Sequence, residues 1–570
     1  MKEKKSKVTY VTVSLLLSAT MLFGIVLPVN GEVHIPEPSI EKQEKNTVTK
    51  KVHPKFSWDN QAPSSPVLHL GSIQGAGMVE QPLKEIDTAM ESLIQEGVMP
   101  GAVTFVARRG HNVQHEAYGH SYLYADDAKT PAEDPITMQK DTIFDLASIS
   151  KIFTTTAAMI LYEDGLFELD DPVAAYIPEF AANGKEDVTI RQLMTHTSGF
   201  TAWVPLYTIG ESREDRLQYV FQYPLANDPG SAYTYSDLNM ITLGALVERL
   251  SGQRLDEFVR EQITEPLGMK DTMYNPSEAL KHRIAATEYQ PWTNRGLVWG
   301  EVHDENAWSL DGVAGHAGVF STAQDLAIFA HMFLNDGTYG SKQILKPETI
   351  KLLSENQIPE FPGDDHGLGW ELAQGWYMDG LSEASTLGHT GYTGTSIVIN
   401  QNNDTIAILL TNRVHPTRST VSTNPARRQF ARLVADAIPV SIPSEEGAWF
   451  SGYGDRADKM LTAEVDFEGD AVLTYDTWYR IEQDWDYGFV EVSNDGENWQ
   501  TLSVYTGSSV GWQTVEVPIP AGTTHIRFHY DTDGSTNNRG WYVTNMKVID
   551  SSNQSVSINL ASEGWVTRNY

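Results

Sequence analysis

Apolar and polar residues recur with two different periods along this chain of 570 residues. From Leu83 to Ile94 the apolar positions are three or four residues apart, and Gly97 then interrupts the pattern, which predicts an amphipathic helix. Ala102–Ala107 and Val113–Tyr118 alternate with a period of two, which is typical of strands. The chain is therefore predicted to enter its first domain as a helix followed by a β-hairpin.

Residues from about 140 to 345 are rich in helical periodicity, and a second predicted hairpin follows at Ser396–Asn400 and Thr405–Thr411. A last helix is expected with Asn424 as its N-cap and Pro425 at its first position. Helices and strands at both ends of a helical insert predict an α+β or α/β domain over residues 70–437.

After a proline-containing linker at residues 438–446, the pattern changes to short alternating runs separated by turn residues. These runs are Val472–Tyr475, Gly488–Val492, Gln513–Val517, His525–Tyr530 and Tyr542–Val548. Many short strands at regular spacing predict an all-β sandwich over residues 447–570.

The N-terminus has the pattern of an export signal. Four lysines lie within the first seven residues, and an apolar run extends from Val8 to Val29. Small residues before Glu32 favour cleavage there, which makes residues 1–31 a signal peptide. An uncleaved membrane anchor is the alternative, because the run is long. Residues 32–69 are interpreted as a proline-rich linker, and the protein is expected outside the cytoplasm, secreted or membrane-anchored.

Composition narrows the classes of function. Asp and Glu number 75 against 41 Lys and Arg, giving a net charge of −34, which disfavours binding to nucleic acid. The chain has no cysteine, which excludes disulfides, thiolate zinc sites, iron–sulfur clusters and a cysteine nucleophile. The chemistry considered below needs no cofactor.

Three segments carry candidate chemistry. Ser148 and Lys151 are three residues apart where an apolar helix is predicted to begin, so they share a helix face. A neutral lysine there could activate the serine. Tyr235 precedes another predicted helix and could move protons if a cation lowers its pKa. The third segment, Gly388-His389-Thr390-Gly391-Tyr392, leads into a strand. Each segment also has a plain structural interpretation, as helix caps, packing aromatics or a turn.

Together, in this order, these segments resemble the serine β-lactamase and penicillin-binding-protein superfamily, whose signature is Ser-x-x-Lys. The stretches Met99–Val103, Leu193–Gly199 and Gly315–Thr322 support a resemblance to its class C-like branch. The resemblance implies an antiparallel sheet flanked by helices, with a helical subdomain, as the fold of the first domain.

The resemblance also implies roles for individual residues. Ser148 would be the acylated nucleophile, and Lys151 and Tyr235 would share the acid and base steps. The amides of Ser148 and Tyr392 would form the oxyanion hole. The residues expected to line the substrate site are Asp237, His389, Thr390, Gly391, His303 and His316. His389 replaces the usual lysine of the family, which weakens the case for an efficient β-lactamase. Asp237 replaces a frequent asparagine, which changes a neutral hydrogen-bonding group into an acid.

The stretch from Val302 to Ala307 pairs a histidine with two acids, but it lacks the spacing of a zinc motif, so no metal is expected there. This stretch and Gly315-His316 resemble family members that act on peptidoglycan fragments, as N-acetylmuramoyl-L-alanine amidases or D-alanine carboxypeptidases. The resemblance therefore implies an exported serine hydrolase with a peptide or muropeptide substrate. A broad carboxylesterase, a β-lactamase and an inactive binding or sensor protein remain the alternatives.

The C-terminal region, from Trp478 to Val543, resembles the MAM-like sandwich of immune-inhibitor-A-type metalloproteases. Such a module implies binding or domain packing, and cell-wall glycan contact through exposed tryptophans is one candidate role. Four turn aspartates, Asp484, Asp486, Asp531 and Asp533, could bind calcium, although turn formation is the favoured interpretation.

Overall fold

The computed structural model describes residues 64–570. The predicted signal peptide and most of the 32–69 linker therefore lie outside the described residues. In the part that is described, no helix is both long and apolar enough to span a membrane.

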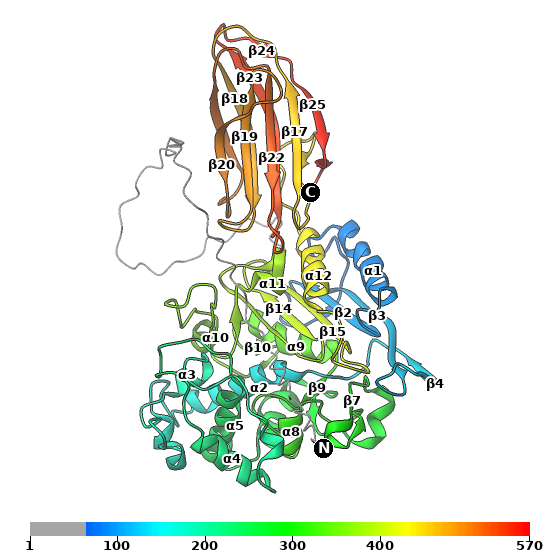
Figure 1. Ribbon diagram of the computed structural model, residues 1–570, viewed down its shortest axis with the longest axis vertical. Helices are drawn as coiled ribbons and strands as arrows, with labels where there is room; N and C mark the ends of the chain where they lie inside the picture. The colour runs from blue at the N-terminus through cyan, green and yellow to red at the C-terminus, as the bar shows by residue number, and fades with distance from the viewer. Residues whose placement is uncertain (1–63) are drawn as a thin grey trace, which may run out of the picture. The chain divides into compact units, whose positions relative to one another are not determined.

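A mixed, mainly antiparallel sheet organises the N-terminal region (Figure 1). Among the described strands its order is β1-β3-β2-β15-β14-β13-β12, with β4 paired to β3. The strands are β1 (His69–Leu70), β2 (Gly101–Arg108), β3 (His111–Tyr124), β4 (Pro131–Thr137), β12 (Glu371–Leu372), β13 (Thr386–Thr390), β14 (Ser396–Asn400) and β15 (Thr405–Thr411). Both predicted hairpins, β2–β3 and β14–β15, are confirmed.

Both faces of this sheet are buried, because successive side chains of a strand point to opposite sides. On one face, Ala102 and Val106 of β2 pack with α1 (Glu80–Gln95) and α12 (Asn424–Asp436), two neighbouring helices in Figure 1. On the other, Phe105 packs in the cluster that contains α2 (Ser150–Glu163) and α9 (Ala323–Leu334). This double burial explains why every residue of β2 is buried and why most of them are apolar.

The start of α12 differs by one residue from the sequence expectation. The helix begins at Asn424, and Thr423 occupies the N-cap position without a side-chain cap. The Asn424 side chain instead accepts a hydrogen bond from Arg427 Nη1 at 2.8 Å. Arg427 thus binds the side-chain oxygen of Asn424 that was expected to cap the helix. The predicted apolar stripe is confirmed, since Phe430 and Val434 are buried.

The insert between β4 and β12 carries the predicted helical subdomain. Its helices, in addition to α2 and α9, are α3 (Ile190–Met194), α4 (Arg213–Gln222), α5 (Asp237–Ser251), α6 (Leu255–Val259), α7 (Glu265–Leu267), α8 (Glu305–Ser309) and α10 (Pro347–Leu353), and α11 (Gly375–Met378) follows β12. Its short strands are β5 (Phe144–Asp145), β6 (Met273–Tyr274), β7 (Tyr289–Gln290), β8 (Gly296–Leu297), β9 (Val319–Ser321), β10 (Thr338–Tyr339) and β11 (Lys342–Gln343). The expected α+β class is confirmed.

The C-terminal region is a β-sandwich, as predicted. One sheet has the order β21-β18-β23-β16-β26 with β24 paired to β23, and the other has the order β20-β19-β22-β17-β25. The strands are β16 (Ala448–Phe450), β17 (Asp458–Glu464), β18 (Ala471–Arg480), β19 (Tyr487–Ser493), β20 (Gln500–Tyr505), β21 (Gln513–Ile519), β22 (His525–Asp531), β23 (Gly540–Asp550), β24 (Ser555–Val556), β25 (Asn559–Glu563) and β26 (Val566–Arg568). Every strand segment predicted here falls within one of them.

Side chains from both sheets fill one core, around Tyr475, Phe528 and Trp541. The predicted domain boundaries stay predictions, although residues 437–447, between α12 and β16, hold no helix or strand.

Candidate active site

A sharp turn presents Ser148. Strand β5 ends at Asp145, and Ala147 takes the left-handed φ of 49°, after which one 3₁₀ turn, η1 (Ala147–Ile149), leads directly into α2. Asp145 Oδ1 accepts a hydrogen bond from the Ala147 amide at 2.8 Å and stabilises this turn. Ser148 therefore lies at the N-terminal entry of α2, where the helix dipole favours developing negative charge.

Lys151 connects the segments that the sequence singled out. Its side chain is 0% exposed. Its Nζ donates to Ser148 Oγ at 2.9 Å and to the carbonyl of His316 at 3.2 Å, and pairs with Asp237 Oδ1 at 2.9 Å. Burial by itself lowers the pKa of Lys151, but its interactions with Asp237 and with Tyr235 outweigh burial, so the pKa lies above its ordinary value. Lys151 is consequently a cation in the resting protein.

Tyr235 lies beside this lysine, whose Nζ is 4.8 Å from the centre of the phenol ring. Burial raises the pKa of Tyr235 more than the charge of Lys151 lowers it. The lowered pKa considered for this tyrosine is therefore not what the structure shows. Both groups hold their protons at rest, and a base must be generated during the reaction.

His196 connects the stretch Leu193–Gly199 to the segment that carries Tyr235. Its Nδ1 accepts from the Ser236 amide at 3.1 Å, and its carbonyl accepts from the Thr234 amide at 2.9 Å. Its ring lies 4.7 Å from that of Tyr235. Ser236, not Asp237, caps α5 by accepting from the Leu238 amide at 3.2 Å, which leaves the Asp237 carboxylate to pair with Lys151.

Strand β13 forms the other side of the site. Its neighbour β12 pairs only with Leu387 and Gly388, so among the described residues no strand covers the same edge at His389 and Thr390. His389 is buried, and burial followed by the charge of Lys151 lowers its pKa to about 3. This histidine is neutral at physiological pH, in agreement with the expected loss of the family's permanent positive charge.

The segment after β13 packs against the turn that presents Ser148. Thr393 Oγ1 donates to the Asp145 carbonyl at 2.8 Å, and Thr395 Oγ1 donates to the Leu146 carbonyl at 3.1 Å. A Cβ at Gly391 would lie 2.1 Å from Thr395 Oγ1 and 2.3 Å from the Leu146 carbonyl oxygen. Only glycine fits this close approach. Tyr392 is the next residue after Gly391. The oxyanion-hole role of the Ser148 and Tyr392 amides stays a prediction.

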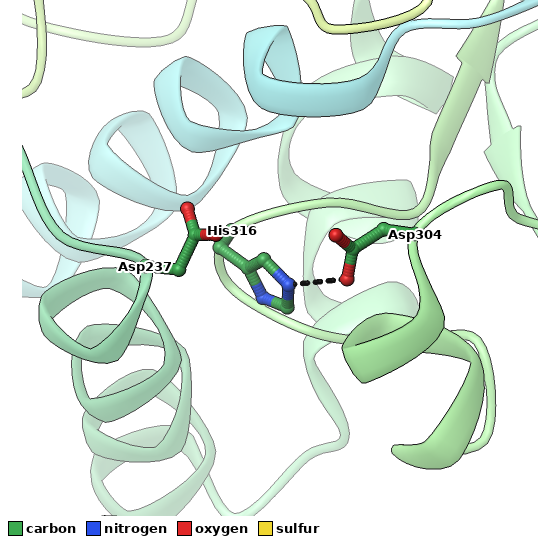
Figure 2. Close-up of side chains that lie close together, drawn as sticks. All are labelled: Asp237, Asp304 and His316. Atoms are coloured by element: carbon green, nitrogen blue, oxygen red, sulfur yellow. Dashed lines mark hydrogen bonds and ion pairs between the residues drawn. The ribbon is translucent and has the colours of Figure 1, made fainter. Parts of the chain in front are cut away.

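The His316 ring lies between the side chains of Asp237 and Asp304 (Figure 2). His316 Nε2 lies 2.7 Å from Asp304 Oδ1, and ligand atoms of all three side chains lie within 4.8 Å of one another. Such a group resembles a metal site in composition. Each carboxylate already has a partner, however, since Asp237 pairs with Lys151 and Asp304 with His316, and the buried lysine would repel a cation.

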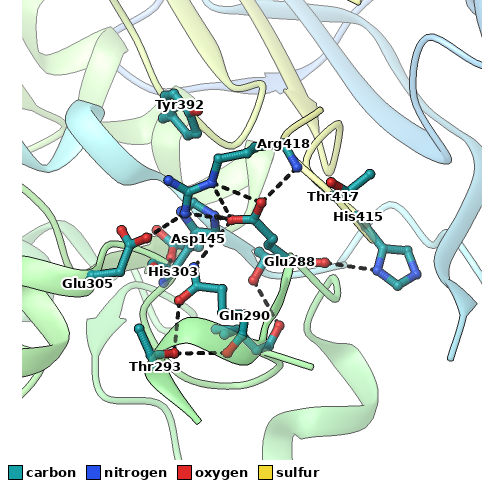
Figure 3. Close-up of polar contacts among 12 residues, drawn as sticks. Asp145, Glu288, Gln290, Thr293, His303, Glu305, Tyr392, His415, Thr417 and Arg418 are labelled. Carbon is teal, nitrogen blue, oxygen red and sulfur yellow. Dashed lines mark hydrogen bonds and ion pairs between the residues drawn. The ribbon is translucent and has the colours of Figure 1, made fainter. Parts of the chain in front are cut away.

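His303 lies in a charged network beside the site (Figure 3). Its amide donates to Asp145 Oδ2 at 2.6 Å, and its Nε2 lies 2.8 Å from Glu288 Oε2. Arg418 donates from Nε to Glu288 at 2.7 Å and from Nη2 to Glu305 at 2.6 Å. The Tyr392 ring stacks on His303, with centroids 5.8 Å apart. His303 thus stabilises the turn that presents Ser148, through its hydrogen bond to Asp145.

The motifs of the sequence do not include Glu288 or Arg418. Arg418 and Glu288 are 130 residues apart and belong to no motif, so no local signal marks them. Asp304 lies within the stretch that was weighed as a metal motif. The structure gives it a different position, as the N-cap of α8 that accepts from the Ala307 amide at 2.7 Å.

Comparison with known proteins agrees with this geometry. Residues 86–432 match the family model described as "Beta-lactamase". A protein of Escherichia coli K12 described as "Putative D-alanyl-D-alanine carboxypeptidase" is 33% identical over 400 residues, covering 65% of this chain and 91% of its own length. A protein of Salmonella agona with the same description is 32% identical over 415 residues, 67% of this chain and 94% of its own.

The likeness to solved structures concerns the fold alone. Unliganded simvastatin synthase from Aspergillus terreus superposes with a TM-score of 0.50 at 22% identity, over 63% of this chain and 98% of that one. The family match, the fold and the Ser148–Lys151 contact agree. This chain belongs to the β-lactamase family and is a serine hydrolase of the penicillin-binding-protein type.

Proposed function

We propose that this protein is an exported serine peptidase that removes the terminal D-alanine from peptidoglycan peptides. The observation that carries the proposal is the buried Ser148–Lys151–Asp237 contact beside an uncovered strand edge, in a chain whose matched relatives are described as D-alanyl-D-alanine carboxypeptidases. A peptide can add as a strand along His389 and Thr390, which brings its carbonyl towards Ser148. The lysine-rich start and the apolar run Val8–Val29 support export.

Arginines next to Tyr392 can supply the positive charge that His389 lacks. The guanidinium groups of Arg413 and Arg418 each lie 5.6 Å from the centre of the Tyr392 ring. Arg418 is neutralised by two glutamates, whereas among the described residues no carboxylate lies within ion-pair distance of Arg413. Arg413 is therefore the candidate partner for the carboxylate at a peptide's C-terminus.

The resting charges define the proton route. Lys151 releases its extra proton to solvent water and becomes the neutral base, beside Asp237 at 2.9 Å. It then takes the Ser148 proton as Oγ attacks the carbonyl carbon, and it returns that proton to the leaving amine as the peptide bond breaks. Water hydrolyses the acyl-enzyme and regenerates Ser148. Asp237, where the family often has asparagine, thus sets the pH at which Lys151 becomes neutral.

Mass spectrometry of defined muropeptides ending in D-Ala-D-Ala tests the substrate. The full-length protein is expected to release one alanine, Ser148→Ala to release none, and the exposed control Ser419→Ala to match the wild type. Release of the whole peptide would instead identify an amidase. Cleavage that persists in Ser148→Ala, or turnover of short esters with no change in any muropeptide, would contradict the proposal.

Contact of the sandwich with cell-wall glycan is a separate proposal. Trp478, Trp541 and Trp565 are buried, whereas Trp485 is 64% exposed and can stack on a sugar ring. Co-sedimentation with insoluble peptidoglycan tests it, and Trp485→Ala is expected to reduce the bound fraction.

A further inference from the structure

Three carboxylates converge in the sandwich, far from Ser148 in sequence. Glu482 follows β18, Asp486 precedes β19, and Asp533 lies in the loop between β22 and β23. One carboxylate oxygen from each lies within 4.8 Å of the other two. Two separate loops therefore direct acids to one point. Of the turn aspartates marked in the sequence, Asp486 and Asp533 belong to this group, whereas Asp484 and Asp531 do not.

Polar atoms at this point lack hydrogen-bond partners. The Asp486 side chain is 0% exposed, and its Oδ1 accepts from the Asp533 amide at 3.0 Å, but its Oδ2 has no partner. Glu482 Oε2 is also buried without a partner. The hydroxyl of the fully buried Tyr530 also has no hydrogen-bond partner. Burial, and then the charge of Asp486, raises the pKa of Tyr530. Buried oxygens without partners cost free energy, and together they indicate a ligand that binds oxygen.

The negative charge of the group is not compensated by nearby bases. No described lysine, arginine or histidine forms an ion pair with Glu482, Asp486 or Asp533, and Arg428 pairs with Asp455 at 3.5 Å. The three carboxylates, whose ligand oxygens lie within 4.8 Å of one another, repel one another. A bound cation would relieve this repulsion.

We propose that Glu482, Asp486 and Asp533 form a calcium site that joins the β18–β19 and β22–β23 loops. Calcium binds carboxylate oxygens at about 2.3–2.6 Å, so two ligand oxygens of one ion lie at most about 5 Å apart. The three ligand oxygens lie within 4.8 Å of one another, which meets that limit.

The two loops also flank contacts with the catalytic region. Arg480, at the end of β18, pairs with Glu383 at 2.7 Å, and Arg539 Nη2 donates to the Ile438 carbonyl at 2.9 Å. The Arg539 amide donates to the Arg480 carbonyl at 2.8 Å, which ties the two strand ends together. Calcium between the loops would therefore stabilise the end of the sandwich that bears these contacts.

Calorimetry of the full-length protein, treated with EDTA and dialysed, tests the site directly. We expect calcium chloride to bind at one site per chain, with a Kd of about 10⁻³ M or lower, and to raise the Tm to a saturating value. Asp486→Asn and Glu482→Gln are each expected to weaken binding about tenfold or more, because each removes a ligand charge. Asp484→Asn removes a charge from the same loop outside the group and should bind like the wild type.

A merely structural role for the acids would give a different pattern. Without calcium, Asp486→Asn should be at least as stable as the wild type, because it removes a buried uncompensated charge. If Asp486→Asn fails to fold, Glu482→Gln, a substitution at a half-buried position, replaces it in this comparison. No heat and no Tm shift at about 10 mM calcium, binding unchanged in Glu482→Gln, or binding lost in Asp304→Asn instead would each overturn the site. Ser148→Ala should bind calcium normally, so this test does not depend on the proposed peptidase activity.

Discussion

The charge of Lys151 depends on its immediate neighbours. Lys151 is fully buried, and desolvation alone would favour its neutral form. Asp237, 2.9 Å away, and Tyr235 together reverse that preference, and the pKa of Lys151 ends above its ordinary value. The resting enzyme therefore stores an ion pair next to Ser148, and the pH at which the base becomes available depends on Asp237.

Replacing Asp237 with asparagine should move the pH dependence of catalysis. The amide can still accept a hydrogen bond from Lys151, but the negative charge that raises the pKa of Lys151 is gone. The pKa of Lys151 then falls, and the neutral base forms at lower pH. The acidic limb of the kcat/KM profile is expected to shift towards lower pH by about one unit or more.

Asp304→Asn is the matched control for that shift. It removes a carboxylate from the same group, but one that contacts His316 and not Lys151. Its acidic limb should move less than that of Asp237→Asn. Equal shifts in both variants would show a general field effect, and no shift in Asp237→Asn would mean that Lys151 is not the titrating base.

Strand β13 and the turn before α2 work as one unit. The threonines at 393 and 395 donate to the carbonyls of Asp145 and Leu146, and Gly391 fills the remaining space against Leu146. These contacts fix the distance between the substrate edge and Ser148. Catalytic geometry of this kind is sensitive to displacements of about 1 Å.

Gly391→Ala should therefore damage catalysis more than stability. The new Cβ would meet Thr395 Oγ1 and the Leu146 carbonyl, and the strand end must move away from the nucleophile. We expect kcat/KM to fall about 100-fold, the loss typical of a misplaced oxyanion donor, as measured by steady-state kinetics with a parallel Tm. The control Gly511→Ala, where no atom lies within 4 Å of the new Cβ, should change neither. Wild-type kinetics in Gly391→Ala would contradict this account.

The catalytic region and the sandwich are joined by buried polar contacts. Arg480 and Glu383 form an ion pair with side chains 4% and 8% exposed, and Arg480 Nη2 also donates to the Ser382 carbonyl at 2.7 Å. Arg568 pairs with Asp436 at the end of α12. Breaking a buried pair leaves one charge without a partner, which costs more than the pair itself contributes.

Arg480→Ala is expected to destabilise the whole molecule by about 3–5 kcal/mol, because Glu383 would remain buried and charged. Denaturant unfolding of the full-length protein measures this loss. The double variant Arg480→Met/Glu383→Gln removes both charges and should recover much of it. If the single and double variants unfold alike, the pair does not couple the two regions.

The elements that were predicted correctly depend on neighbours in the sequence. The two hairpins, α1, α12 and five sandwich strands follow from periodicity and turn residues within short windows. The contact between Ser148 and Lys151 also follows from their spacing of three residues across a helix start. Composition alone excludes cysteine chemistry, because the chain contains no cysteine.

The charge states and the supporting network could not be derived in this way. The pairing of Lys151 with Asp237, of Glu288 with Arg418, and the meeting of Glu482, Asp486 and Asp533 join segments that are separate in the sequence. A pKa depends on burial and on charges within a few ångströms, and only tertiary packing fixes both. The sequence by itself therefore determined these elements, the family and the spacing that brings Lys151 to Ser148. The tertiary structure decided which groups are charged, and where a proton or a cation can reside.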